Sequence, residues 1–248
     1  MVKEACIHIQ QADFGYVGKN GPVKLLQNFS ASFYPGERIG LVGLNGVGKS
    51  TFIRTLAGLQ PLLSGSITIG KQTLSESSAL DLAKQMALVL TERPAGFNLT
   101  VFDVVASGQM PYTNAFHRLE AEHLDVIRKA ISLIGIEPFQ HKELAELSDG
   151  MFQKTLIAKA LAQQTPILLL DEPSAFLDYG SKHELFLLLK QLSLEQQKCI
   201  LVSSHDLDLL IKYCDKLLVL THHSAELIPV SEAMHHEGFK AIGGKFLH

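Results

Sequence analysis

A glycine-rich run at residues 43–51 ends in a lysine and two hydroxyl side chains, a combination that could bind phosphate. The run fits the pattern G-x-x-x-x-G-K-[ST] at Gly43, Gly48, Lys49 and Ser50. Glycines allow successive backbone N–H groups to curl around a phosphate, and a helix that begins near Lys49 adds the positive end of its dipole. Lys49 can reach the β and γ oxygens of a nucleotide, and the hydroxyl of Ser50 can ligate Mg²⁺. The phosphate-binding residues that we expect are Gly43, Asn45, Gly46, Gly48, Lys49, Ser50 and Thr51.

Two adjacent carboxylates, Asp171 and Glu172, follow the apolar run at residues 167–170. Neighbouring residues of a strand point to opposite faces, so the two carboxylates should have different roles. Asp171 suits the Mg²⁺ shell, largely through water, and Glu172 suits the general base that polarises an attacking water. The alternative is a solvated acidic turn, which is the commoner fate of an isolated Asp-Glu pair. The phosphate-binding run and this strand end together indicate a P-loop nucleotidase.

Strands alternate with helices along the chain, which argues for an α/β fold with a mostly parallel sheet covered on both faces. We expect strands at residues 7–12, 38–42, 66–69, 87–90, 167–170, 199–203 and 216–220, and a strand pair at 23–33 after a glycine-marked loop at 15–22. Helical periodicity covers residues 49–59, 100–108, 119–134, 152–162, 184–194 and 206–213. Between about 91 and 150 the pattern is helical without a strand, which predicts a helical subdomain inserted in a single domain of residues 1–248.

The composition excludes several classes of protein. A length of 248 residues with 46% hydrophobic side chains supports a sizeable core, and the net charge of -3 gives no electrostatic reason to expect nucleic acid. Three widely separated cysteines form neither a disulfide framework nor a zinc spacing, so we expect a reduced cytosolic compartment. No signal peptide is expected, and no apolar stretch approaches the ~20 residues that span a bilayer. If the protein works at a membrane, another chain must supply the spanning helices.

The residues between and after the two motifs resemble the ATP-binding subunits of ABC transporters. Leu-Ser-Asp-Gly-Met at 147–151 resembles the family signature L-S-G-G-Q, at a spacing before Asp171 that is typical of the family. Residues 174–178 resemble the D-loop, and Ser-Ser-His-Asp at 203–206 resembles the switch histidine segment. Tyr16 matches the aromatic residue that stacks on adenine. The resemblance implies a P-loop NTPase fold, with a RecA-like, mostly parallel sheet, an N-terminal antiparallel β part and the inserted helical subdomain.

Membership of this family implies a head-to-tail homodimer with two ATP molecules at its interface. Ser148 and Gly150 of one subunit would then face the γ-phosphate held by Lys49 of the other, where a hydroxyl, a backbone N–H and a helix N-terminus suit an anion. His205 would contact the γ-phosphate and sense its loss, and Asp178 would complete the site.

The sequence departs from the family pattern at three positions. Asp149 replaces a glycine of the signature and Met151 replaces its glutamine, but the two residues expected at phosphate are retained. Thr91 replaces the Q-loop glutamine that joins Mg²⁺ and the attacking water to the membrane subunit, and Glu92 follows it. Thr91 could still ligate the metal through its hydroxyl, which would change coupling rather than abolish ATP binding.

The segment Gly-Gln-Met-Pro-Tyr at 108–112 resembles the G-R-x-P-[HY] stretch of ATPases that import iron-siderophore, haem and cobalamin, with Gln109 in place of arginine. This resemblance implies polytopic permease subunits and an extracytoplasmic substrate-binding protein as partners, no nucleic acid, and a peripheral place on the cytoplasmic face of a bacterial inner membrane. The alternative is that the segment only packs inside the helical subdomain.

Two rival functions remain open. A soluble ABC ATPase, such as a translation or repair factor, usually carries two ATPase units, long insertions or a basic surface. A P-loop kinase or GTPase that acts alone has no use for a phosphate contact made in trans. We interpret the paired histidines at 222–223 and 235–236 as solvated, and assign no role to residues 222–248.

Overall fold

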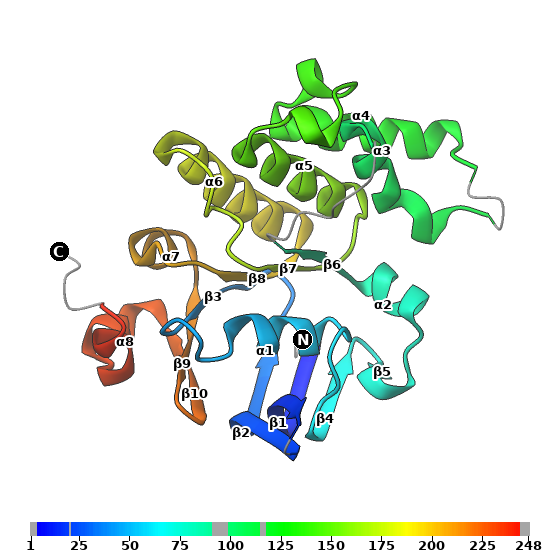
Figure 1. Ribbon diagram of the computed structural model, residues 1–248. Coiled ribbons are helices and arrows are strands. Elements are labelled where there is room, and N and C mark those ends of the chain that lie inside the picture. The colour runs from blue at the N-terminus through cyan, green and yellow to red at the C-terminus, as the bar shows by residue number, and fades with distance from the viewer. Residues whose placement is uncertain (1–3, 20, 91–98, 115–117, 244–248) are drawn as a thin grey trace.

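Two β-sheets lie against each other with helix α1 (Lys49–Leu56) between them (Figure 1). The computed structural model describes residues 4–19, 21–90, 99–114 and 118–243. The larger sheet contains β3 (Arg38–Val42), β6 (Met86–Val89), β7 (Ile167–Leu170), β8 (Cys199–Ser203), β9 (Lys216–Thr221) and β10 (Ser224–Pro229). The smaller sheet contains β1 (Ile7–Gly18), β2 (Gly21–Phe33), β4 (Ser64–Ile69) and β5 (Gln72–Thr73). In the described parts of the chain, no helix is both long enough and apolar enough to cross a membrane.

The larger sheet has the order β10-β9-β3-β8-β7-β6, with parallel pairing from β9 to β6 and an antiparallel edge strand β10. Side chains alternate across it, so Leu169 and Leu201 pack toward α1 and the smaller sheet. Leu168 and Val202 pack toward α6 (Tyr179–Gln196) and α7 (Leu207–Tyr213) on the other face. Burial on both faces explains the unbroken apolar runs of these strands, which the sequence analysis places correctly.

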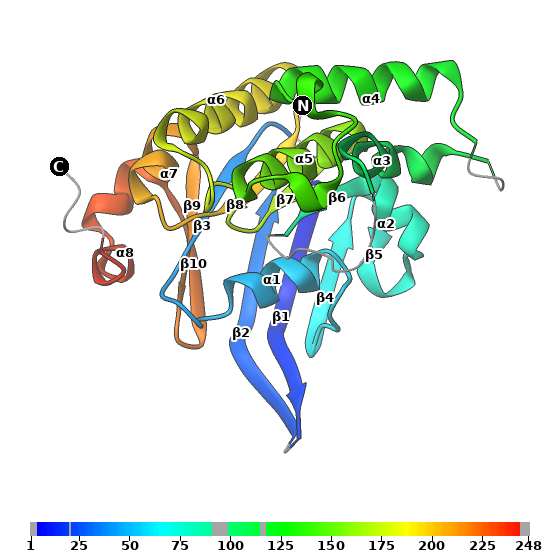
Figure 2. The same cartoon turned by 45° about the horizontal axis from the view of Figure 1, so that its top comes forward.

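The smaller sheet is antiparallel, in the order β2-β1-β4-β5, and its long β1–β2 hairpin projects from the molecule (Figure 2). The expected loop at 15–22 is wrong, because β1 continues to Gly18 and β2 begins at Gly21. The expected strand pair at 23–33 is a single strand. A Cβ on Gly15 would lie 2.0 Å from the carbonyl oxygen of Val23, so this glycine serves the close approach of two strands rather than a turn.

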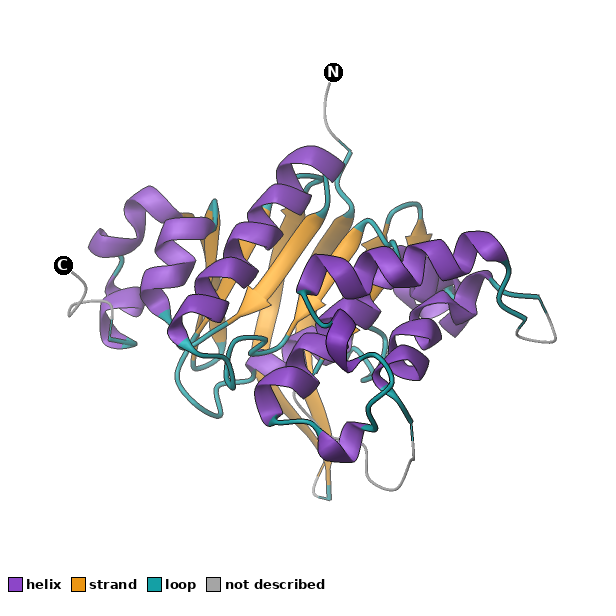
Figure 3. Cartoon of the chain, turned by 90° about the horizontal axis from the view of Figure 1, so that it is seen from above, coloured by secondary structure: helices purple, strands orange, loops and turns teal. Residues whose placement is uncertain are grey.

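A helical layer lies beside the larger sheet and has its own apolar core (Figure 3). It contains α3 (Val101–Ala106), α4 (Ala121–Ile134) and α5 (Asp149–Ala162), with 3₁₀ turns at residues 107–112, 137–139 and 144–146. Thr100 and Asp103 cap each other's backbone N–H groups at the start of α3, which fixes where the helix begins. The described residues between 99 and 148 form no strand, apart from an isolated bridge between Thr100 and Glu143.

Besides the 3₁₀ turns, four elements are not anticipated by the sequence analysis: α2 (Ala79–Gln85), β5, β10 and α8 (Glu237–Ala241). Each is short, and β10 buries only Ile228, so its pattern is weak. The interpretation of the histidine pairs as solvated is wrong for His236. Its ring lies 3.0 Å from the Glu226 carboxylate, and its Nδ1 accepts the backbone N–H of Phe239 to cap α8.

Candidate nucleotide-binding and hydrolytic site

The glycine-rich loop lies between β3 and α1, where the sequence analysis predicts it. Gly48 has a φ of 114°, a left-handed conformation that favours glycine. A Cβ on Gly43 would lie 2.7 Å from a side-chain carbon of Val47 and 2.9 Å from the carbonyl oxygen of Leu220, so the loop can turn this tightly only with glycine there. Asn45, Gly46 and Ser50 are exposed and Thr51 is half-buried. The loop can therefore present backbone N–H groups and hydroxyls to a phosphate at the start of α1.

Lys49 folds back over this loop and is 8% exposed. Its Nζ donates a hydrogen bond to the Gly43 carbonyl oxygen at 2.9 Å. Burial lowers the pKa of Lys49, whereas the carboxylates of Glu172 and Asp171 act in the opposite direction and raise it. The predicted cation and the two predicted carboxylates therefore share one site.

Ser203, at the end of β8, links the two carboxylates and has no role in the sequence analysis. Its buried hydroxyl donates to Asp171 Oδ1 at 2.7 Å and accepts the backbone N–H of Glu172 at 2.8 Å. Glu172 has a φ of 50°, so a left-handed backbone just beyond β7 separates it from Asp171. The sequence offers one clue to this role: Ser203 stands two residues before His205, at the end of a strand that pairs with β7.

Glu172 has a buried carboxylate oxygen, Oε1, that makes no hydrogen bond. The His205 ring lies close to it, with Nε2 3.2 Å from Oε1, but the two atoms form no hydrogen bond. Burial raises the pKa of Glu172, while His205 and Lys49 act to lower it. His205 itself is 58% exposed and donates its backbone N–H to Glu172 Oε2 at 3.3 Å. A buried acceptor without a donor can receive the proton of a bound water.

The signature and the D-loop meet at a second surface. Ser148 caps α5 by accepting the backbone N–H of Met151 at 3.3 Å. A Cβ on Gly150 would lie 2.9 Å from the Phe176 carbonyl oxygen, so glycine permits the close approach of the two segments. Asp178 caps α6 by accepting from the backbone N–H and the hydroxyl of Ser181, both at 2.9 Å, and these bonds lower the pKa of its carboxyl. In the described chain neither Ser148 nor Asp178 bonds to residues 43–51.

The remaining residues that were predicted to bind nucleotide or metal make no described contact with residues 43–51. Tyr16 is exposed on β1, opposite Val23 of β2. Thr91 and Glu92 lie outside the described residues. Within the described ranges, no three His, Cys, Asp or Glu side chains gather into a metal-binding group. A divalent ion at this edge would therefore need a hydroxyl and phosphate oxygens in addition to Asp171.

Comparison with known proteins decides the family. The family model described as "ABC transporter" matches residues 26–175, which is more than half of the chain. The chain belongs to this family. It is 38% identical to an uncharacterized ABC transporter ATP-binding protein of Methanocaldococcus jannaschii, over 82% of this chain and 70% of the relative. It is 34% identical to the petrobactin import ATP-binding protein FpuC of Bacillus anthracis, over 88% and 81%. It is 32% identical to the iron(3+)-hydroxamate import ATP-binding protein FhuC of Bacillus subtilis, over 85% and 77%.

Solved structures agree on the fold of this ABC protein. A metal-chelate type ABC transporter in an inward-facing conformation superposes with a TM-score of 0.82 at 22% identity, over 97% of this chain and 89% of that one. A dimeric ABC transporter cassette superposes with a TM-score of 0.80 at 22% identity, over 90% and 98%. The expected P-loop NTPase fold is therefore confirmed. The family match and the ATP-binding relatives confirm an ABC ATPase that binds ATP.

The importer-like segment 108–112 of this ABC ATPase packs against the end of α5. The buried side chain of Gln109 donates to the Ala162 carbonyl oxygen, and the Tyr112 hydroxyl donates to the Gln163 carbonyl oxygen at 2.9 Å. A Cβ on Gly108 would lie 2.4 Å from the Lys159 carbonyl oxygen. The segment therefore donates hydrogen bonds to carbonyl oxygens that the C-terminal end of α5 leaves unpaired. This agrees with the alternative in the sequence analysis, in which the segment packs inside the helical subdomain.

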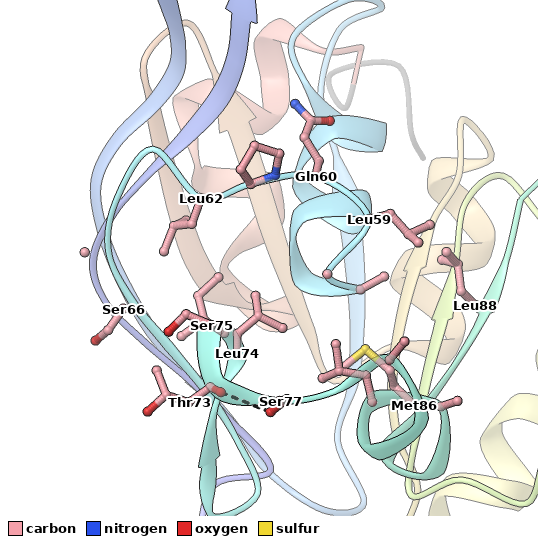
Figure 4. A pocket seen from close by; sticks show the side chains of 18 of the residues that line it. Leu59, Gln60, Leu62, Ser66, Thr73, Leu74, Ser75, Ser77, Met86 and Leu88 are labelled. Atoms are coloured by element: carbon pink, nitrogen blue, oxygen red, sulfur yellow. Dashed lines mark hydrogen bonds between the residues drawn. The ribbon is translucent and has the colours of Figure 1, made fainter. Parts of the chain in front are cut away.

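A groove with a volume of about 810 Å³ lies beside these contacts, between the end of α1, β4, α2, β6 and α5 (Figure 4). Apolar side chains dominate its lining: Leu59, Leu62, Leu74, Leu82, Met86 and Leu88. Hydroxyl side chains, Gln163 and Lys159 complete it. The sequence analysis does not find this groove, because folding brings it together from residues 57–67, 73–88 and 159–163. We call it the α2–α5 groove.

Proposed function

We propose that this chain is the ATP-hydrolysing subunit of an importer for an iron-siderophore, haem or cobalamin-type substrate, and that two copies act as a head-to-tail dimer with Mg²⁺. The observation that carries the hydrolytic part is the buried Oε1 of Glu172, which accepts no hydrogen bond and lies in the same site as Lys49 and Asp171. The named relatives that import petrobactin and iron-hydroxamate support the substrate class.

The chemistry follows from the placement of the side chains. ATP stacks on Tyr16, and the N–H groups of residues 43–51 bind its phosphates together with the ammonium of Lys49. The hydroxyl of Ser50 and the carboxylate of Asp171 are hard oxygen donors that would hold Mg²⁺, which neutralises charge on the phosphate oxygens when bound. Thr91, which lies outside the described residues, stays a predicted ligand of the metal. Glu172 accepts a proton from water through Oε1, and His205 contacts the γ-phosphate.

The second copy completes the site in this proposal. Ser148, Gly150 and Asp178 contribute from its signature and D-loop, whose rim exposes Phe176 and Tyr179, the latter by 79%. Exposed apolar side chains that lie together are typical of an association surface. The similarity to a dimeric cassette supports the same arrangement.

The proposed importer also requires a partner that spans the membrane. We infer a polytopic permease that rests on the helical subdomain of residues 91–150 and the adjoining α2–α5 groove, with a substrate-binding protein on the far side of the membrane. The chain would then be peripheral on the cytoplasmic face of the inner membrane. The alternative is an ABC ATPase that works without a permease.

Purification of the tagged chain from detergent-solubilised native membranes tests the proposal. A polytopic permease recovered in about equal amount supports the importer, and ATP hydrolysis stimulated by candidate iron chelates in reconstituted vesicles narrows the substrate. Recovery of an active dimer without any membrane protein would favour the alternative and overturn the importer.

A further inference from the structure

An ion pair joins the segment that carries His205 to the first turn of α6. The ammonium of Lys182 lies 2.9 Å from Oδ2 of Asp206, the residue directly after His205, and both side chains are only partly exposed. Both residues line a cleft of about 360 Å³ between α6 and α7 (Figure 1). The pair therefore connects the two helices next to the hydrolytic site.

Asp206 stands where an aspartate usually caps a helix, but its carboxylate has other partners. It is the residue before α7, and at this position an Asp side chain typically accepts a backbone N–H of the first turn. Asp206 makes no such side-chain bond. Its Oδ2 accepts instead from Lys182 and, at 3.4 Å, from the hydroxyl of Ser174, which is fully buried in the D-loop. The carboxylate therefore connects three segments rather than capping its own helix.

Lys182 occupies a helix position that disfavours a cation. It lies at the end of the first turn of α6, where its charge opposes the positive end of the helix dipole. The same turn holds the D-loop, because Asp178 accepts the backbone N–H of Ser181 and, through its carbonyl oxygen, that of Lys182, both at 2.9 Å. One turn of helix thus holds Asp178 and Asp206. Helix formation gives no reason for a lysine here, whereas the contact with Asp206 does.

The place of His205 depends on the backbone on either side of it. Two residues earlier, the Ser203 hydroxyl accepts the backbone N–H of Glu172 at 2.8 Å, and one residue later Asp206 is held by Lys182. Between these points the His205 ring lies 3.2 Å from Glu172 Oε1. The ring is largely exposed, so packing does little to fix it. A shift of the backbone at Asp206 would therefore move the ring away from Glu172.

We propose that Lys182 is a positioning residue for ATP hydrolysis, whose ion pair with Asp206 fixes the backbone that keeps His205 beside Glu172. The inference rests on the proposed function and adds a residue that acts through His205 rather than by contact with ATP. A partly exposed ion pair contributes little to the stability of a fold, so the chain should fold without it. A small displacement of a group at a reacting centre, by contrast, lowers turnover strongly.

Steady-state kinetics of the purified full chain test this role. Lys182→Met keeps the aliphatic stem and removes the charge, so kcat should fall about tenfold while the KM for ATP stays within about twofold, because the phosphate loop is unchanged. Lys182→Arg should keep kcat within about threefold of the wild-type value, because a guanidinium can make the same single contact. Rescue by arginine would show that the charge matters and not the length of the side chain alone.

Variants of the neighbouring residues show whether the two side chains act as a pair. Asp206→Asn should lower kcat by a similar factor, and the double variant Lys182→Met/Asp206→Asn should be no slower than either single variant. Lys212→Met is the matched control, because Lys212 lines the same cleft but its ammonium lies over the Tyr213 ring. Its kcat should equal that of the wild type. A double variant slowed by the product of the single effects would contradict the pair.

NMR spectra of the histidine rings separate this inference from the proposed function, because they do not depend on turnover. The His205 signal is assigned by its loss in His205→Ala. Lys182→Met and Asp206→Asn should both move it, and Lys212→Met should leave it in place. Wild-type kcat in Lys182→Met, or a His205 signal that moves equally in Lys182→Met and Lys212→Met, would overturn the positioning role and leave the hydrolytic site standing. A wild-type chain without ATPase activity would overturn the proposed function, and the NMR comparison would then decide alone whether Lys182 positions His205.

Discussion

The catalytic edge of the larger sheet contains the buried Lys49 and the α2–α5 groove contains the half-buried Lys159, and the two lysines stand in different surroundings. Lys49 donates to the Gly43 carbonyl oxygen and faces two carboxylates. Lys159 has none of these partners in the described chain. The first site is assembled within one chain and can bind a phosphate as it stands. The second contains a lysine with no carboxylate among the described residues that line the groove, so the two sites differ in how their cation is satisfied.

The largest effect on ATP hydrolysis is expected from a substitution at the catalytic edge. Glu172→Gln removes the carboxylate that accepts a proton from water but keeps the size of the side chain. Hydrolysis should fall by about 10²- to 10⁴-fold, while nucleotide binding persists. Steady-state ATPase assays and equilibrium titration with a fluorescent nucleotide measure the two quantities. Turnover at the wild-type rate would remove Glu172 from the role of base.

A smaller effect is expected on the affinity for ATP when Lys49 is replaced. Lys49→Ala removes a charged donor to the phosphates, and such bonds contribute about 1.5–3 kcal/mol, so the Kd for ATP should rise about 10- to 100-fold. Calorimetric titration of ATP against Lys49→Ala and Lys159→Ala compares the two lysines. If Lys159→Ala weakened ATP binding equally, the division of the molecule into two sites would be wrong.

Ser203 should have an intermediate effect on turnover. Ser203→Ala leaves the Glu172 N–H and an Asp171 oxygen without a buried partner, and we expect kcat to fall about tenfold with a similar KM for ATP, because such a loss amounts to ~1–3 kcal/mol. The Mg²⁺ concentration that half-saturates hydrolysis should rise, since Asp171 loses its orienting bond. Ser204→Ala is the control, because that hydroxyl accepts the Asp206 N–H and does not bond to either carboxylate. An unchanged Mg²⁺ dependence in Ser203→Ala would reduce its role to packing.

The sequence predicts the catalytic edge far better than it predicts the groove, for a physical reason. Strands 38–42, 167–170 and 199–203 are buried on both faces, so their apolar runs reveal their limits. The phosphate loop is contiguous, and its glycines are required by the backbone. Ser203 escapes notice because its hydroxyl acts across two strands, on residues about thirty positions away.

The errors have the same origin. Gly15 looks like a turn residue in the sequence, but the neighbouring strand, far along a hairpin, decides its role. The α2–α5 groove is built from three separated segments, one of which includes the short and weakly patterned α2. No local pattern can indicate a groove whose walls meet only in the folded chain.

The smallest effect is expected at segment 108–112, where packing and partner contact make different predictions. Gln109→Ala leaves the Ala162 carbonyl oxygen without its donor and opens a small cavity, so stability should fall by about 1–2 kcal/mol. Thermal unfolding followed by circular dichroism should show a Tm lower by about 2–8 °C. Tyr112→Phe, which removes a more exposed bond to the Gln163 carbonyl oxygen, should lower it less. ATPase activity below the transition should be unchanged in both variants. If Gln109→Ala kept the wild-type Tm but lost the permease, the segment would contact the partner directly, and the interface would extend beyond the α2–α5 groove.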